Sequence, residues 1–279
     1  MTVRLGRFGA WMSPATDEQT RRKTALEAEK LGYGAVWFGI GSGTVEDLAF
    51  FEEVLAATET VTVATAIVNM WTNDAGRIAA SYHRLIGRYG NRFLLGVGVG
   101  HPESVAQYES PYAKMVGYLD RLDAEGVPKE GRILAALGDK SLKLAADRTL
   151  GAHPYLVPPA HTGHARKILG PNAILVPEHK IVVEEDAKAA RLIGRPFVEK
   201  PYLGLRNYVS NLRRHGYTEE DLAGSGTDRL IDDLVLHGSP STIANRLGEH
   251  LTEGADHVGI HVLGPDILTG YRKLAEVAL

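Results

Sequence analysis

The sequence predicts an α/β fold, a single (β/α)8 barrel that spans residues 1–279. The length fits the roughly 250 residues that such barrels commonly need. Eight short apolar segments also alternate with amphipathic helical patterns, and no linker rich in Pro, Gly or Ser divides the chain into two domains. A doubly wound open sheet is the alternative, because eight such units can also be arranged side by side.

The expected strands are apolar on both faces, which is typical of parallel sheets covered by helices. They comprise residues 4–12, 35–40, 61–68, 93–99, 132–137, 152–157, 174–183 and 257–263.

The helices between them have recognisable ends. The first is expected to begin at Asp17 as N-cap and to stop at Gly32. Thr44 and Asp47 resemble a capping box for the second helix. A later helix is expected to begin at Ser239, followed by a proline at its first position, and to stop before the last strand. The stretch 195–238 is irregular and predicts about two additional helices, including 205–214.

Composition excludes several function classes. Hydrophobic residues make up 44% and charged residues 23% of the chain, which are ordinary globular values. The net charge of -3, without long runs of like charge, argues against nucleic acid and anionic membranes as partners. The absence of cysteine excludes disulfides and thiolate metal sites. We expect a cytoplasmic protein, because neither a signal peptide nor an apolar stretch of ~18 residues is apparent.

The strand at 93–99 leads through Gly96, Gly98 and Gly100 to His101. Glycine inside a strand often marks a close approach by another group, so the three glycines suggest a place where a ligand rests. His101 is either an acid or base near neutral pH or a hydrogen-bonded packing residue. The spacing G-x-G-x-G does not match the dinucleotide-binding fingerprint G-x-G-x-x-G.

A second candidate is an anion site at Leu137, Gly138 and Asp139, where a strand ends and a helix begins. Free N–H groups at a helix start favour a phosphate, and Gly138 lets it come close. The alternative is a tight turn with Asp139 as N-cap. We expect no metal site, and His161 and His164 are assigned a surface or capping role. Paired carboxylates are also missing from the loops after the strands, which argues against glycoside chemistry.

Five stretches of the chain, in order, resemble the luciferase-like monooxygenase family, the flavin- or F420-dependent barrel proteins related to bacterial luciferase. They are residues 28–37, 63–69, 92–98, 151–162, and 238–244 taken with 254–258. The last two are similar to actinobacterial members classed as F420-dependent oxidoreductases.

The resemblance implies a TIM barrel with a deazaflavin or flavin ring at the C-terminal mouth. It implies a bulge in the third strand with a non-prolyl cis peptide, which by position is Ala66–Ile67, and a cofactor phosphate near Gly138. Flavin-binding luciferases have a phosphate-contacting arginine where this chain has Val99, which favours F420 over FMN. An F420-dependent sugar-phosphate dehydrogenase has a histidine after its second strand, whereas residues 38–41 of this chain contain none. His101 is then the expected proton donor.

The expected function is F420-dependent hydride transfer to or from a small organic substrate, with His101 catalytic. The expected cofactor-binding residues are Trp11, Gly39, Ala66, Ile67, Asn69, Gly98, Val99, Gly100, Leu137, Gly138, Asp139 and Tyr155. An FMN-dependent monooxygenase and a non-catalytic cofactor-binding barrel are the alternatives. A homodimer formed through helices beside the second and third strands is a further expectation.

Overall fold

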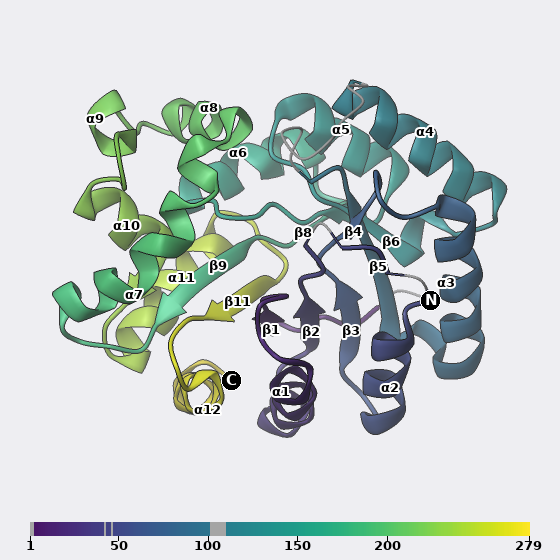
Figure 1. The fold of residues 1–279 in the computed structure, drawn as a ribbon, viewed down its shortest axis with the longest axis horizontal. Helices are drawn as coiled ribbons and strands as arrows, with labels where there is room; N and C mark the ends of the chain where they lie inside the picture. Colours follow the sequence, from purple (N-terminus) through teal and green to yellow (C-terminus); the bar gives the residue numbers. More distant parts are fainter. Residues whose placement is uncertain (1–2, 42, 46, 101–109) are drawn as a thin grey trace.

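The structure is a computed structural model that describes residues 3–41, 43–45, 47–100 and 110–279. Parallel strands lie at its centre and helices surround them (Figure 1). The strands are β1 Phe8–Met12, β2 Ala35–Phe38, β3 Thr62–Thr65, β4 Val68–Asn69, β5 Phe93–Gly98, β6 Arg132–Leu134, β7 Gly151–Ala152, β8 Ile174–Leu175, β9 Glu178–Val182, β10 Val235–His237 and β11 Val258–Val262. The α-helices are α1 Glu18–Leu31, α2 Ala49–Ala57, α3 Ala75–Tyr89, α4 Pro111–Ala124, α5 Asp139–Arg148, α6 Pro159–Leu169, α7 Ala187–Glu199, α8 Arg206–Arg214, α9 Glu219–Leu222, α10 Asp228–Leu234, α11 Pro240–Thr252 and α12 Ile267–Ala278.

The sheet closes on itself through one continuous segment, β8 to β9. The hydrogen-bonded order runs from β9 through β11, β1, β2, β3, β5, β6 and β7 to β8. Only Val176 and Pro177 separate β8 from β9. The Val176 amide donates to the carbonyl of Ala152 in β7, and the Pro177 carbonyl accepts from Gly259 in β11. We count β3 with β4, and β8 with β9, as one barrel strand each, and call each of the barrel strands a stave. The ring then has eight staves, so the predicted (β/α)8 barrel is confirmed.

The predicted helix ends are mostly correct. The Asp17 side chain accepts from the Thr20 amide, Gly32 adopts the left-handed conformation, and Ser239 caps α11. The capping box at Thr44 and Asp47 is wrong. The N-cap of α2 is Leu48, which has a positive φ of 57° and makes no side-chain cap bond, because the chain enters this helix through a left-handed turn.

Three helices and one strand fill the irregular stretch before the last barrel strand. They are α8, α9, α10 and β10, whereas the sequence predicts about two helices and no strand there. A hydrophobic cluster packs Tyr208, Leu212 and Leu230 of this insertion together with Val182 of β9 and Val198 of α7. Because β10 has only three residues and follows α10 directly, its apolar signal is too short to separate from the helix.

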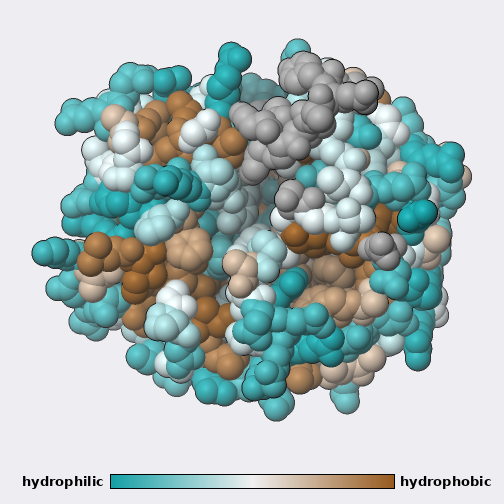
Figure 2. Space-filling model, in the orientation of Figure 1, coloured by the Kyte–Doolittle hydropathy of each residue, from teal (hydrophilic) through white to brown (hydrophobic). Residues whose placement is uncertain are grey.

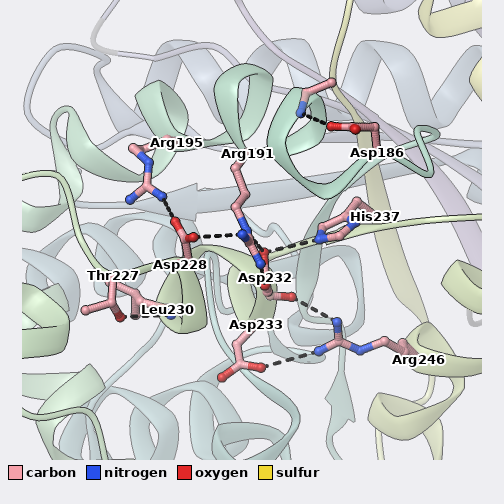
Figure 3. Close-up of polar contacts among 11 residues, drawn as sticks. Asp186, Arg191, Arg195, Thr227, Asp228, Leu230, Asp232, Asp233, His237 and Arg246 are labelled. Carbon is pink, nitrogen blue, oxygen red and sulfur yellow. Dashed lines mark hydrogen bonds and ion pairs between the residues drawn. The ribbon is translucent and has the colours of Figure 1, made fainter.

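Ion pairs connect the insertion to the barrel helices (Figure 3). Arg191 of α7 bonds Asp228 and Asp232 of α10, at 2.7 and 2.5 Å. From α11, Arg246 donates to the Asp232 carbonyl at 3.0 Å and pairs with Asp233. A shared network of this kind holds α7, α10 and α11 in one arrangement more effectively than isolated surface pairs would.

Packing within the protein explains Gly96 and Gly98 of β5, which corrects their interpretation as the resting place of a ligand. Gly100, which follows β5, lines the cavity described below. A Cβ atom on Gly96 would lie 2.0 Å from the Thr65 carbonyl oxygen, and one on Gly98 would lie 2.9 Å from the Ala135 Cβ. Gly100 has a positive φ of 58° and approaches the Asn69 amide. Neighbouring strands therefore require these glycines.

The core contains several buried neutral histidines. His257 accepts a hydrogen bond from the Trp37 indole at 3.0 Å and donates from Nδ1 to the Gly6 carbonyl at 2.9 Å. Trp37 is fully buried. Burial lowers the pKa to about 4 at four histidines of the chain, which are His153, His161, His179 and His257.

No helix among the described residues combines the length and apolar character needed to cross a bilayer.

We predict that Thr65→Val destabilises the protein by about 2–4 kcal/mol. The Thr65 hydroxyl donates to the Gly96 carbonyl at 2.8 Å and accepts from the Gly96 amide at 2.7 Å, so valine would leave both groups buried without partners. Thr65→Ser keeps the hydroxyl and should cost only about 1 kcal/mol for the lost methyl. Urea unfolding measures both, and equal losses in the two variants would contradict this role.

Stability should fall with acid between about pH 6.5 and pH 4. The four histidines have folded pKa values of about 4, whereas the unfolded chain has ordinary values near 6.5. The unfolded state therefore binds protons first as the pH falls, and each site contributes about 3 kcal/mol that is present at neutral pH and lost in acid. Because burial also lowers the pKa of His250, chemical unfolding at a series of pH values should give a slope of at least four protons. An unfolding free energy that stays constant down to pH 5 would refute this prediction.

Candidate active site

A cavity of about 560 Å³ lies at the carboxyl ends of the barrel strands. Its lining comes from β1, β2, the β3–β4 junction, β5, β6, β7 and β11, and from the inserted stretch after α7. Figure 2 shows the molecular surface hollowed near the centre of the face drawn in Figure 1. In a (β/α)8 barrel this is the end at which active sites are found.

Most of the predicted cofactor-binding residues meet in this cavity. Those that line it are Trp11, Gly39, Ala66, Ile67, Asn69, Val99, Gly100, Leu137, Gly138 and Tyr155. Two do not. Gly98 faces Ala135 and Ile67, and the Asp139 carboxylate bonds His164 at 2.9 Å. His101, the predicted catalytic residue, lies outside the residues that the structure describes.

One wall of the cavity is formed by the irregular third stave. Between the paired positions Ala64–Leu94 and Val68–Val97, this stave has three residues where β5 has two, which makes a bulge. The Ala66–Ile67 peptide inside the bulge is cis, as the resemblance implies. Ala66, Ile67 and Val99 give this wall an apolar surface.

The start of α5 opens onto the same wall. Gly138 is the N-cap and makes no side-chain cap bond, so the alternative with Asp139 as N-cap is wrong. A Cβ atom on Gly138 would meet nothing within 4 Å. Ser141 donates to the Gly138 carbonyl and also lines the cavity. Uncapped first-turn amides beside open space suit the phosphate of a flavin or deazaflavin.

The floor of the cavity is aromatic. The Trp11 indole donates to Nε2 of His153 at 3.3 Å, and His153 Nδ1 donates to the Val176 carbonyl at 2.7 Å. The Tyr155 ring lies 5.2 Å from the Trp11 ring. Since both nitrogens of His153 are engaged and burial lowers its pKa to about 4, it is a neutral structural residue.

A buried charged cluster beside this floor was missed by the sequence analysis. Glu178 and Lys180 of β9 are almost completely buried and pair at 2.9 Å, and Nδ1 of His261 in β11 lies 3.1 Å from the same Glu178 oxygen. Burial alone would raise the pKa of Glu178, but Lys180 and His261 hold it well below its usual range. The sequence signal that could have revealed this cluster is the charge of Glu178 and Lys180 at alternate positions of an otherwise apolar strand.

The described residues contain no group of three or more potential metal ligands. The surface or capping role assigned to His161 is wrong: its side chain is fully buried, because α6 packs it beneath the carbonyl of Leu137, to which Nε2 donates at 3.0 Å. His164 is half-exposed beside Asp139.

A family model described as luciferase-like monooxygenase matches residues 2–124. Among solved structures, an F420-dependent secondary alcohol dehydrogenase is similar with a TM-score of 0.77 and 13% identity, over 98% of both chains. The F420-dependent tetrahydromethanopterin reductase of Methanopyrus kandleri has a TM-score of 0.77 and 15% identity, over 97% of both chains. The oxygenating constituent of a Pseudomonas putida 3,6-diketocamphane monooxygenase, in complex with FMN, has a TM-score of 0.71 and 12% identity, over 98% of this chain and 97% of that one.

A search of curated protein sequences found no match. At these identities the solved structures support the fold alone, and they include binders of F420 and of FMN. The resemblance that the sequence predicts is nevertheless confirmed: residues 2–124 match the luciferase-like monooxygenase family, an oxidoreductase family, and the chain has the fold of its structural neighbours.

Proposed function

We propose that this chain is an F420-dependent oxidoreductase that transfers a hydride to or from a small organic substrate. The observation that carries the proposal is a cavity in which an apolar backbone wall and the uncapped start of α5 lie side by side. A flat, largely apolar ring with a phosphate-bearing tail matches this pair of features.

Individual residues have distinct roles in this proposal. The Ala66–Ile67 backbone and Val99 support one face of the ring, and the first-turn amides after Gly138 hold the phosphate. Trp11 and Tyr155 in the aromatic floor exclude water from the ring. When bound, the cofactor would supply the carbon that gives or accepts the hydride. His101 stays the sequence-based candidate for the accompanying proton.

The choice between F420 and FMN rests on the phosphate end of the cavity. Val99 lines the wall where flavin-binding luciferases have an arginine, and Lys200 is the one Lys or Arg among the described lining residues. A phosphate held mainly by backbone amides favours F420 over FMN. An FMN-dependent monooxygenase is the second candidate, because an FMN-bound monooxygenase shares the fold.

The melting temperature of the purified protein, titrated separately with F420 and with FMN, tests the assignment. A ligand present at 100 times its dissociation constant adds about 2.7 kcal/mol of stability. We expect a rise with F420 and little change with FMN. A rise with FMN alone would replace the proposal by the monooxygenase, and no rise with either would leave a barrel that binds neither cofactor.

Gly138→Asp should raise the stability of the ligand-free protein and weaken F420 binding at least about tenfold. The aspartate would cap α5, which contributes about 1 kcal/mol, and would repel the phosphate from the same amides. Gly138→Ala is the matched control, since its Cβ has free space and no charge. Isothermal titration with F420 measures both variants. Unchanged affinity in Gly138→Asp would exclude the start of α5 as the phosphate site.

A further inference from the structure

The two sides of the cavity differ in chemistry. In the ring of eight staves, β5 and β11 are diametrically opposed, because three staves separate them in either direction. The β5 side presents backbone and small apolar side chains, including Val99. The β11 side presents His261, with the aromatic rings of Trp11 and Phe197 beside it. A ring bound on the β5 side would leave the β11 side to the substrate.

Nδ1 of His261 is held by Glu178, and Nε2 has no hydrogen-bond partner among the described residues. Its Nδ1 lies 3.1 Å from the Glu178 carboxylate, which only accepts hydrogen bonds, so Nδ1 carries the proton. The lone pair is then on Nε2, the remaining nitrogen of a side chain that lines the cavity. Trp11 packs against the imidazole with its ring centroid at 4.6 Å. His153 lines the same cavity but has both nitrogens engaged.

Buried hydrogen bonds fix the Glu178 carboxylate beside this imidazole. Its carboxylate is fully buried and also accepts from Lys180 at 2.9 Å and from the Leu156 amide at 3.1 Å. Lys180 in turn lies over the Tyr155 ring at 3.8 Å. A carboxylate kept ionised at this distance stabilises an imidazolium and fixes the ring orientation, the role of the third member of a catalytic triad.

Several other titratable groups lie around His261, and Lys180 bonds the same Glu178 oxygen as His261 does. Those packed near it or lining the same cavity are Lys180, His153, Tyr155, Lys200, Tyr202 and Tyr208. Lys180 lies opposite His261 in the sheet, and its charge is balanced by Glu178.

We propose that His261 is a catalytic acid–base residue, positioned by Glu178, for a small apolar substrate that carries a hydroxyl or carbonyl group. The proposal rests on the proposed function and gives His261 the proton transfer that the sequence alone assigned to His101. In the oxidative direction the carbinol C–H bond breaks and its hydride passes to the proposed F420. The O–H bond breaks and its proton passes to Nε2 of His261, which leaves a carbonyl group and an imidazolium balanced by Glu178. In the reductive direction the hydride returns to the carbonyl carbon, and the proton returns from Nε2 to the oxygen.

Chemical modification of the ligand-free protein tests the available nitrogen without any cofactor. Diethyl pyrocarbonate acylates neutral, accessible histidine nitrogens, and peptide mass spectrometry maps the sites. We expect His261 to react at least about tenfold faster than His153, the matched control in the same cavity. Equal inertness of the two histidines would overturn the proposal, because Nε2 of His261 would then be closed to ligands.

The pH dependence of that reaction tests Glu178. In Glu178→Gln the imidazolium loses its counter-ion, so the midpoint of the His261 reaction should move to lower pH, while a merely structural role predicts no movement.

If this variant does not fold, Glu178→Gln combined with Lys180→Met removes both buried charges together. The double variant should keep the melting-temperature rise caused by F420 and lose at least about tenfold in turnover; wild-type turnover in it would exclude Glu178 as the positioning residue.

Turnover with F420 separates this inference from the proposed function, with 2-propanol and cyclohexanol as probe substrates. His261→Gln should lose at least about a hundredfold in hydride transfer and keep the F420-induced rise in melting temperature.

Failure of F420 to stabilise the wild type would refute the proposed function, while the modification experiment would still decide whether Nε2 is available. Unchanged turnover in His261→Gln would refute the catalytic role, and wild-type protein that binds F420 but oxidises neither alcohol would refute the substrate class.

Discussion

The barrel depends on the closure made by the segment from β8 to β9, and the Glu178 carboxylate lies at that closure. It bonds the Leu156 amide after β7, Lys180 within β9 and His261 in β11, so one buried side chain connects three consecutive staves. Removing one partner of a buried ion pair typically costs 3–5 kcal/mol, since the other charge is left without compensation. The same interaction that completes the ring also fixes the imidazole at the cavity.

A second constraint shapes the opposite side. The bulge at Ala66–Ile67 interrupts the ladder to β5, and Thr65 replaces the missing contact through its hydroxyl. Gly96 is required there because the Thr65 carbonyl occupies the space of a side chain. The cavity is therefore bounded by backbone on one side and by aromatic and titratable side chains on the other. The inserted helices, held by the Arg191 network, supply the rest of the rim.

Much of the site could be predicted because it follows the ends of strands. The apolar segments fix eight staves, and active-site residues of such barrels follow them, so Trp11, Asn69 and Gly138 could be named in advance. The phosphate site could be read from a strand that ends at a glycine before a helix. The glycines of β5 were misjudged, since a sequence does not distinguish close approach by a neighbouring strand from close approach by a ligand.

The sequence by itself determined the barrel, the helix caps at Asp17 and Ser239, and the resemblance that locates the cis peptide, because these depend on local periodicity and short motifs. Only the tertiary structure decided which polar residues meet. Glu178 and His261 are 83 positions apart and become neighbours because β9 and β11 pair in parallel with Lys180 opposite His261. Which distant strands become neighbours is decided when the sheet closes, so the sequence of either strand alone does not show that Glu178 and His261 meet.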